Sequence, residues 1–213
     1  MKPKQPLLIF PYNGNGLEAL DCIDDSFLFL GFVDDTPEKL GQTSYGHQVF
    51  GREAFTNFPD ALVLAVPGSP DTYRSRGRTI NGLGLKNERF AKVIHPNARV
   101  SPMATFGNNL LIMAGVVITS NAIIGSHCCI LPNTVIHHDV KIGDRTLIGA
   151  SVTIAGSTVV EENCYIGSGS TLKNGLRVGA RALIGMGSNV IRNVNEDTRV
   201  VGNPARELIK TDI

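Results

Sequence analysis

The chain has 213 residues, with 20 Lys and Arg against 19 Asp and Glu and a formal net charge of +1. This balance provides no large electrostatic field for nucleic acid or an anionic membrane surface, so we expect neither as a partner. The length suffices for one large domain or two small ones. With 23 Gly, no Trp and only 18% charged residues, the composition favours a turn-rich β architecture over a helical bundle.

The N-terminal region predicts neither a secretion signal nor a membrane anchor. Its apolar run at 7–10 is followed by proline and is too short for a signal peptide. No segment approaches the roughly 20 apolar residues that a bilayer-spanning helix needs. The cysteines show no CxxC spacing, and free cysteines are typical of the reducing cytosol. We therefore expect a cytoplasmic protein.

The first 94 residues predict alternating strands and helices. Strands are expected at 7–10, 27–35, 61–68 and 90–96, and short helices at 17–23 and 71–80. This alternation predicts a small parallel sheet with helices on its faces. Ligands on such sheets bind at the carboxyl ends of the strands. The glycine turn NGNG at 13–16 and the pair Asp34–Asp35 are therefore candidate ligand contacts, against the alternatives of an ordinary strand–helix turn and a solvated strand end.

A six-residue period follows. From Val100 to Val190, every sixth residue is aliphatic or Phe, sixteen positions in a row without an insertion. This period fits neither a helix nor a simple strand, and a sandwich of ordinary strands would not keep such a register. Glycine often comes directly after the aliphatic residue, and we interpret it as permitting backbone angles at a corner. Each hexapeptide is then one short strand and a turn, and stacked triangular coils bury an aliphatic column.

The repeat, as in IGDRTL at 142–147, resembles the hexapeptide-repeat left-handed β-helix of the acyltransferase superfamily. The order of a front domain, then HPNARVSP at 95–102, then hexapeptides resembles the sugar acyltransferases that include nucleotide-sugar N-acetyltransferases and sialic acid O-acetyltransferases. The resemblance implies an α/β domain with a small Rossmann-like sheet at 1–94. A left-handed parallel β-helix with a short C-terminal cap would follow at 95–213. It also implies a homotrimer with acyl-CoA clefts between neighbouring β-helices.

The sequence VIHHDV interrupts the repeat with His137, His138 and Asp139. The aliphatic column leaves no room for an imidazole, so we expect Ile136 to point inward and the polar residues outward. A β-helix corner usually takes Gly, Asn or Asp, and we expect these three residues to cost the repeat its preferred turn residue. A histidine beside a carboxylate is a candidate general base, because its unperturbed pKa of about 6.5 is close to working pH. The alternative is two solvated surface histidines.

The resemblance also implies roles for single residues. His138 would be the base and Asp139 its orienting partner, while the neighbouring His137 would contact substrate or itself be the base. Acetyl-CoA would be attacked directly, without an acyl-enzyme and without a metal. Two groups of contacts are implied for the ligands: Asn13, Gly14, Asn15, Asp34 and Asp35 for the nucleotide, and Gly156, Ser168 and Met186 for the pantetheine arm. The chain departs from the family pattern at Pro11 and Asn15 in the turn, and at Leu147, where a second histidine is common.

We therefore expect acetyl-CoA-dependent N-acetylation of a nucleotide-linked amino sugar, a 4-amino-4,6-dideoxy sugar, in O-antigen or similar surface-glycan synthesis. Three alternatives stay open. One is O-acetylation of a free sugar such as a sialic acid, and another is a non-catalytic β-helix that only binds. The third is a zinc carbonic anhydrase, which takes two histidines five residues apart, whereas His127 is ten and eleven residues from His137 and His138.

Overall fold

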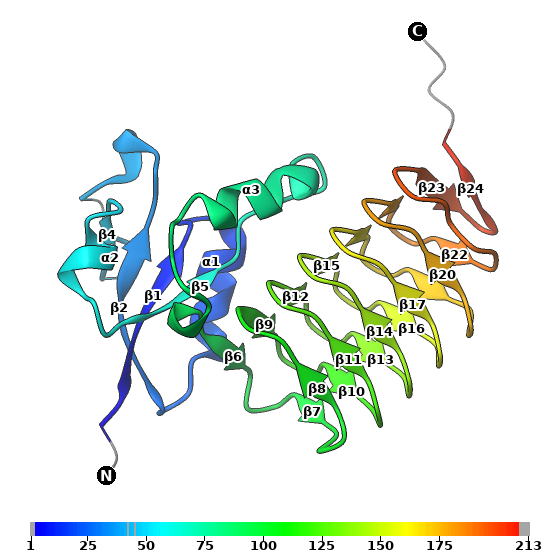
Figure 1. Cartoon of the computed structure of the whole chain (residues 1–213), viewed down its shortest axis with the longest axis horizontal. Coiled ribbons are helices and arrows are strands. Elements are labelled where there is room, and N and C mark those ends of the chain that lie inside the picture. Colours follow the sequence, from blue (N-terminus) through cyan, green and yellow to red (C-terminus); the bar gives the residue numbers. More distant parts are fainter. Residues whose placement is uncertain (1–2, 42, 45, 209–213) are drawn as a thin grey trace, which may run out of the picture.

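The front part of the chain forms a small sheet with short helices around it (Figure 1). The computed structural model describes residues 3–41, 43–44 and 46–208. The sheet has the order β3-β4-β2-β1-β5, with β3 antiparallel to β4 and the other pairs parallel. Its strands are β1 Gln5–Phe10, β2 Phe27–Val33, β3 Thr43–Ser44, β4 His47–Phe50 and β5 Leu62–Ala65. The expected strands near 7–10, 27–35 and 61–68 are confirmed, whereas β3 and β4 were not predicted.

The helices of this part are short, and several are single 3₁₀ turns. They are α1 Gly14–Glu18, η1 Ala19–Cys22, η2 Pro37–Lys39, α2 Ala54–Asn57, η3 Tyr73–Ser75, α3 Arg76–Asn81 and η4 Asn87–Arg89. The helix expected at 17–23 begins earlier, because the side chain of Asn13 caps it by accepting from the N–H of Gly16 at 2.8 Å. Residues 13–16, expected as a glycine turn with an ordinary strand–helix turn as the alternative, form the N-cap and first turn of α1.

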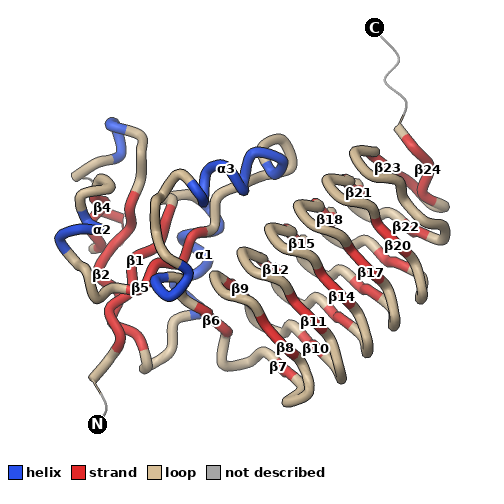
Figure 2. The backbone as a smooth tube through the Cα atoms, viewed as in Figure 1, coloured by secondary structure: helices blue, strands red, loops and turns tan. Residues whose placement is uncertain are grey.

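The rest of the chain is a three-sided prism of stacked coils (Figure 2). Each face is a parallel sheet of very short strands, and we name the faces by one member strand. The β13 face contains β7 Arg99–Val100, β10 Val117–Ile118, β13 Val135–Ile136, β16 Thr153–Ile154, β19 Thr171–Leu172 and β22 Asn189–Val190. The β14 face contains β8 Thr105–Phe106, β11 Ile123–Ile124, β14 Lys141–Ile142, β17 Val159–Val160 and β20 Arg177–Val178.

The β15 face begins and ends the prism. It contains β6 Lys92–Ile94, β9 Leu110–Ile112, β12 Cys129–Ile130, β15 Leu147–Ile148, β18 Tyr165–Ile166, β21 Leu183–Ile184, β23 Arg199–Gly202 and β24 Ala205–Glu207. The final pair, β23 and β24, is antiparallel and closes the last coil. The predicted fold class, a small α/β domain followed by a parallel β-helix with a short cap, is therefore confirmed. The strand expected at 90–96 is β6, which pairs with β9 in the prism; Phe90, just before β6, forms an isolated bridge with Val63 of the front sheet.

Equivalent residues in neighbouring coils are 18 positions apart, as in the pairing of Val117 with Val135 and of Val135 with Thr153. The predicted inward positions of the repeat, from Ile112 to Val190, are buried and form one continuous hydrophobic cluster. The glycine that often follows an inward residue does not have the left-handed backbone, so our interpretation of it as a corner residue was wrong. The left-handed backbone angle falls two residues after such a glycine, for example at Asn109, His127 and Arg145, with φ of 56 to 62°.

The glycines instead allow successive coils to approach each other closely. A Cβ on Gly143 would lie 2.5 Å from the backbone nitrogen of Glu162, and one on Gly149 would lie 2.5 Å from that of Ser168. Real Cβ atoms do not come so close to backbone, so a larger residue at either position would push two coils apart. Glycine is therefore required by the spacing between coils rather than by the corner conformation.

The small buried residues of the repeat also make a recurring hydrogen bond. Thr134 Oγ1 donates to the carbonyl of Gly149 at 2.7 Å, Thr158 Oγ1 to Lys173 at 3.1 Å, and Ser170 Oγ to Gly185 at 2.9 Å. Each acceptor is 15 residues further along, at the same corner of the next coil. These bonds satisfy carbonyl groups that the two-residue strands leave without a partner.

The front domain is joined to the prism by a buried asparagine. Asn109, 1% exposed, accepts from the N–H of Ala65 at 2.7 Å and donates to the carbonyl of the same residue at 2.8 Å. Its amide thus continues the β5 edge of the front sheet as another strand would. The Asn109 amide nitrogen also lies 3.1 Å from Nδ1 of His127, whose ring contacts Phe90 edge-on.

We predict that Asn109→Gly lowers the free energy of unfolding by about 2–4 kcal/mol, because it leaves both backbone groups of Ala65 without partners in a buried interface. Glycine accepts the left-handed backbone of this corner, so the change removes the amide without adding strain. The measurement is urea unfolding followed by circular dichroism at fixed protein concentration. The control is Asn133→Gly, the same change at an exposed left-handed corner, with an expected effect below about 1 kcal/mol. Equal losses in both variants would contradict the prediction.

Candidate functional site

The site begins at the edge of the prism between β13 and β14, where the chain turns through His137, His138 and Asp139. Ile136 is fully buried, as expected, while His138 and Asp139 are exposed and His137 is half-buried. Asp139 itself has the left-handed conformation, with φ of 59°. The expected loss of the preferred turn residue is therefore wrong, since the aspartate occupies the turn position that favours Asn, Asp or Gly. The two histidines lie just before that position and interrupt nothing.

His138 and Asp139 form a hydrogen-bonded pair. Nδ1 of His138 lies 2.8 Å from Oδ2 of Asp139, with 61% and 50% of the two side chains exposed. Because an ionised carboxylate only accepts hydrogen bonds, Nδ1 carries the proton and Nε2 is left as the nitrogen that can accept one. The hydrogen bonds from His138 and from Asn121 lower the pKa of Asp139, which keeps the carboxylate ionised. The pair thus has the arrangement of a general base with its orienting carboxylate.

His137 lacks such a partner. Across residues 3–41, 43–44 and 46–208, its side chain has no hydrogen bond, ion pair or ring contact, although its backbone N–H bonds the carbonyl of Ile154. Of the two adjacent histidines, His138 alone has an orienting carboxylate.

Sequence reasoning missed Asn121, whose amide donates to Oδ1 of Asp139 at 3.1 Å. Asn121 is 18 residues before Asp139 and occupies the same corner one coil earlier. The period of 18 could have identified it. Gly156, assigned to the pantetheine arm, lies under the His138 ring: a Cβ there would lie 2.5 Å from Nε2.

Ser168 and Met186 lie elsewhere. They are one coil apart on the edge between the β15 and β13 faces, and Met186 is 77% exposed. His138 and Gly156 lie on the edge between the β13 and β14 faces. Within one chain, the three residues assigned to acetyl-CoA are therefore divided between two edges of the prism.

Asn13, Gly14 and Asn15 lie at the carboxyl end of β1, as predicted. The side chain of Asn13 is engaged as the cap of α1, while a Cβ on Gly14 would meet nothing within 4 Å. The amide nitrogen of Asn15 points toward the loop after β5 and lies 3.5 Å from the carbonyl of Gly68. Of the three, Gly14 and Asn15 keep groups open to a ligand.

Asp34 and Asp35 differ in their surroundings. Asp34 is 3% exposed and accepts from the backbone N–H groups of Tyr12 and Thr36 and from Nζ of Lys39, each at 2.9 Å. Burial raises the pKa of Asp34, but the hydrogen bonds from Thr36 and Lys39 outweigh it, so that the pKa is lowered. Asp35 is exposed and binds Arg52 through both oxygens, at 2.6 and 2.7 Å. Asp34 therefore holds the strand end together, and Asp35 remains at the surface.

A cavity of about 180 Å³ lies where the front domain meets the prism. Asn15 and the loop after β5 form one wall, and outward-facing residues of the β15 face form the other. The lining residues are Asn15, Gly68, Ser69, Pro70, Cys129, Leu131, Leu147, Ile148, Gly149 and Tyr165. The wall is mainly apolar, and Leu147, at the position where the resemblance implies a second histidine, contributes to it. Asn15 is the sequence-predicted nucleotide contact that reaches this space.

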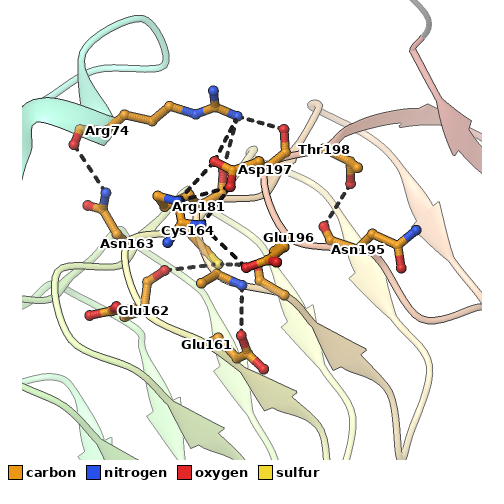
Figure 3. A network of polar contacts seen from close by, with 12 residues as sticks. Arg74, Glu161, Glu162, Asn163, Cys164, Arg181, Asn195, Glu196, Asp197 and Thr198 are labelled. Carbon is orange, nitrogen blue, oxygen red and sulfur yellow. Dashed lines mark hydrogen bonds and ion pairs between the residues drawn. The ribbon is translucent and has the colours of Figure 1, made fainter.

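The same interface is fixed by a docking arm, residues 73–77, which runs along the edge between the β14 and β15 faces. Arg76 Nη2 donates to the carbonyl of His127 at 2.8 Å, and the Tyr73 hydroxyl donates to that of Arg181 at 2.8 Å. Asn163 Nδ2 donates to the carbonyl of Arg74 at 3.2 Å. Figure 3 shows Arg74 above Asn163, reaching towards Arg181 and Asp197. The arm thus bonds the corner residues of several successive coils.

Neither a metal-binding cluster nor a membrane-spanning helix occurs within the described part of the chain. No group of three or more His, Cys, Asp and Glu side chains there has the arrangement of a metal site. None of the helices formed by those residues has the length and apolar character of a bilayer-spanning segment.

Comparison of the sequence with protein families gives one match, the family described as bacterial transferase hexapeptide (six repeats). It matches three times in overlapping registers, at residues 103–138, 121–156 and 139–174. Successive matches begin 18 residues apart, which is the length of one coil. A comparison with curated protein sequences gives no match.

Solved structures share the fold over nearly the whole chain. The PerB protein of Caulobacter crescentus, in complex with CoA and GDP-perosamine, has a TM-score of 0.82 at 22% identity, covering 98% of both chains. The acetyltransferase domain of PglB from Neisseria gonorrhoeae, in complex with acetyl coenzyme A, has a TM-score of 0.83 at 23% identity, covering 97% of this chain and 100% of that one. WeeI from Acinetobacter baumannii has a TM-score of 0.81 at 24% identity, with the same coverage.

We predict that Asp34→Asn lowers the free energy of unfolding by about 1–3 kcal/mol at pH 7, since it removes a buried charged partner of Lys39. The pKa of Asp34 is depressed in the folded protein, so its contribution is present above the unfolded pKa of about 3.9 and is lost as the pH falls through the folded value. In urea unfolding, the difference in the free energy of unfolding between wild type and Asp34→Asn should therefore shrink below about pH 4. The matched control is Asp35→Asn at the exposed pair with Arg52, where we expect a change below about 1 kcal/mol. A difference that grows in acid would contradict the prediction.

Proposed function

We propose that this chain, which carries the hexapeptide repeat of the bacterial transferase family, is an acetyl-CoA-dependent N-acetyltransferase of a nucleotide-linked amino sugar. The observation that carries the proposal is the hydrogen bond of 2.8 Å between Nδ1 of His138 and Asp139 on an exposed corner of the prism. It leaves Nε2 as the nitrogen that can accept a proton, on a side chain that is 61% exposed and that an amine can therefore approach. The likeness in fold to the Caulobacter and Neisseria proteins, solved with CoA or acetyl coenzyme A, supports the choice of donor.

The proposed step is direct attack of the sugar amine on the thioester carbonyl. The amine nitrogen forms the amide bond, the carbon–sulfur bond breaks, and CoA leaves as the thiolate. His138 Nε2 takes the proton that the amine loses, and Asp139 stabilises the imidazolium that forms. The proton can then pass to the thiolate, which restores the base.

The cysteines support a route without an acyl-enzyme. Cys22, Cys128, Cys129 and Cys164 are all buried. Burial raises the pKa of each of these thiols to about 12. A thiol that stays protonated and out of solvent is a poor nucleophile. We therefore assign the chemistry to the base alone.

We assign acceptor binding to residues 1–94 and the acetyl transfer to residues 95–213. The nucleotide would lie at the carboxyl end of the front sheet, near Gly14 and Asn15, which keep groups open to a ligand, and near the exposed pair of Asp35 with Arg52. Asn13 and Asp34 would support this surface indirectly through the cap of α1 and the end of β2. The Caulobacter protein was solved with GDP-perosamine, which supports a nucleotide-linked sugar as the acceptor. We propose that the sugar is a 4-amino-4,6-dideoxy sugar and that its product serves surface-glycan synthesis such as that of O-antigen.

We further propose that the chain works as a homotrimer in the cytoplasm. His138 and Gly156 lie on one edge of the prism, whereas Ser168 and Met186 lie on another. A single chain therefore separates the base from part of the surface assigned to acetyl-CoA. Packing of one copy's edge against that of its neighbour would bring the two together, with His137 beside the acceptor.

The substrate assay follows release of free CoA with UDP-, dTDP- and GDP-linked amino sugars, and with free amino sugars and sialic acid as comparisons. We expect one nucleotide-linked amino sugar to have the highest kcat/KM. Faster turnover of a free sugar would contradict the role given to the front domain, and preference for sialic acid would establish the O-acetylation alternative. No turnover of any acceptor would favour a binding protein without catalysis.

We predict that His138→Ala lowers kcat by about 10²–10⁴-fold, because the amine loses its general base. Unchanged thermal unfolding would show that the exposed corner still folds. His137→Ala should lower kcat far less, since His137 has no orienting carboxylate. A larger loss in His137→Ala than in His138→Ala would move the base to His137.

A further inference from the structure

The corner that carries His138 belongs to a column of residues in three successive coils. Asn121, Asp139 and Ser157 are 18 residues apart, and all three have the left-handed conformation, with φ of 59 or 60°. The residue directly before the corner is His138 in the middle coil and Gly156 in the next one. The stacking of coils therefore fixes which side chains lie on either side of the His138–Asp139 pair.

On one side, Asn121 holds the carboxylate. Its amide donates to Oδ1 of Asp139 at 3.1 Å, while Oδ2 accepts from His138 Nδ1 at 2.8 Å. Each carboxylate oxygen thus has its own N–H donor, and the two donors come from different coils. An exposed pair of side chains loses most of its interaction energy to rotational freedom. A second donor on a stiff backbone corner restricts that freedom for Asp139, and through Asp139 for the imidazole.

On the other side, Gly156 provides room for the ring. A Cβ at this position would lie 2.5 Å from Nε2 and 2.6 Å from Cε1 of His138. The φ of Gly156 is not in the left-handed region, so glycine is not required there by the backbone. What it allows is an imidazole lying flat against the next coil.

We propose that Asn121 and Gly156 are positioning residues for His138: Asn121 fixes the carboxylate that orients the ring, and Gly156 leaves the space in which Nε2 lies. This inference rests on the proposed function of His138 as the base. It gives Gly156 a role other than contact with the pantetheine arm. The two roles predict different effects on CoA binding.

The first experiment measures the geometry without using activity. Long-range ¹H–¹⁵N spectra of the imidazoles show which nitrogen of His138 carries the proton when the ring is neutral. In the wild type we expect the proton on Nδ1. In Asn121→Gly and in Gly156→Ala we expect a mixture of tautomers, since the ring is no longer held against Asp139. An unchanged tautomer in both variants overturns the proposal, whatever the enzyme is found to acetylate.

The second experiment uses charge and the pH profile of kcat/KM. Asn121→Asp keeps the shape and the corner conformation but places a second carboxylate beside Asp139. The titratable groups at this corner are His138 and Asp139, with His137 next to them and Lys141 following in β14. Added negative charge favours the protonated imidazole, so the acid limb should move to higher pH by about half a unit. Asn133→Asp, at a left-handed corner on another edge, should leave the limb in place, and equal shifts would overturn the proposal.

The third experiment distinguishes a role in positioning His138 from a role in binding CoA. Asn121→Gly should lower kcat about tenfold in the wild type and have no further effect in an Asp139→Ala background, because Asn121 acts through Asp139. Gly156→Ala should lower kcat about tenfold or more while the Kd of CoA, measured by calorimetry, changes less than about threefold. Losses of kcat that simply add when Asn121→Gly and Asp139→Ala are combined would overturn the proposal. So would a weaker affinity of Gly156→Ala for CoA with kcat preserved. Absence of all activity in the wild type would instead refute the proposed function and leave the tautomer result as the test.

Discussion

The register of 18 residues between stacked coils is the constraint on which the rest of this structure depends. It places the aliphatic residues of every coil in one buried column, and it requires glycine where adjacent coils approach most closely, as at Gly143 and Gly149. It also aligns buried hydroxyl groups such as that of Thr134 with carbonyls of the next coil. A side chain's neighbours in space are therefore found 18 positions before and after it. The site follows the same rule, with Asn121 on one side of Asp139 and Gly156 on the other side of His138.

A second consequence concerns the front domain. The corner residues on the edge between the β14 and β15 faces form a regular row, and the front domain bonds several members of it in turn. Asn109 completes the edge of the front sheet at Ala65, and Arg76 donates to the carbonyl of His127. Arg76 is 1% exposed and its hydrogen bonds go to main-chain oxygens. The two parts of the chain are thus joined by directional bonds to a rigid row, which fixes the cavity between them.

The two carboxylates that sequence reasoning treated as a pair show how local surroundings divide similar residues. Asp34 is buried and accepts three hydrogen bonds, so it stabilises the end of β2. Asp35, one residue later, points to the surface and pairs with Arg52. The alternation of side chains along an extended chain puts one inside and the other outside. At the other site the corner divides the residues instead: Ile136 ends β13 inside the column, and the chain then turns outward through His138 and Asp139.

The sequence by itself determined the prism, because a six-residue period of aliphatic residues has no other regular structure that could bury it. It also determined that His137, His138 and Asp139 lie outside, since the column has no room for them. It did not determine which atoms meet. The hydrogen bond from Asn121 crosses between coils, and the bonds of Asn109 cross from the prism to the front sheet, so no local pattern encodes either of them. The division of Gly156, Ser168 and Met186 between two edges, in contrast, follows from the period, because Ser168 and Met186 are 18 residues apart whereas Gly156 and Ser168 are 12 apart. Periodicity specifies which face a residue occupies, whereas contacts between distant segments are decided by tertiary packing.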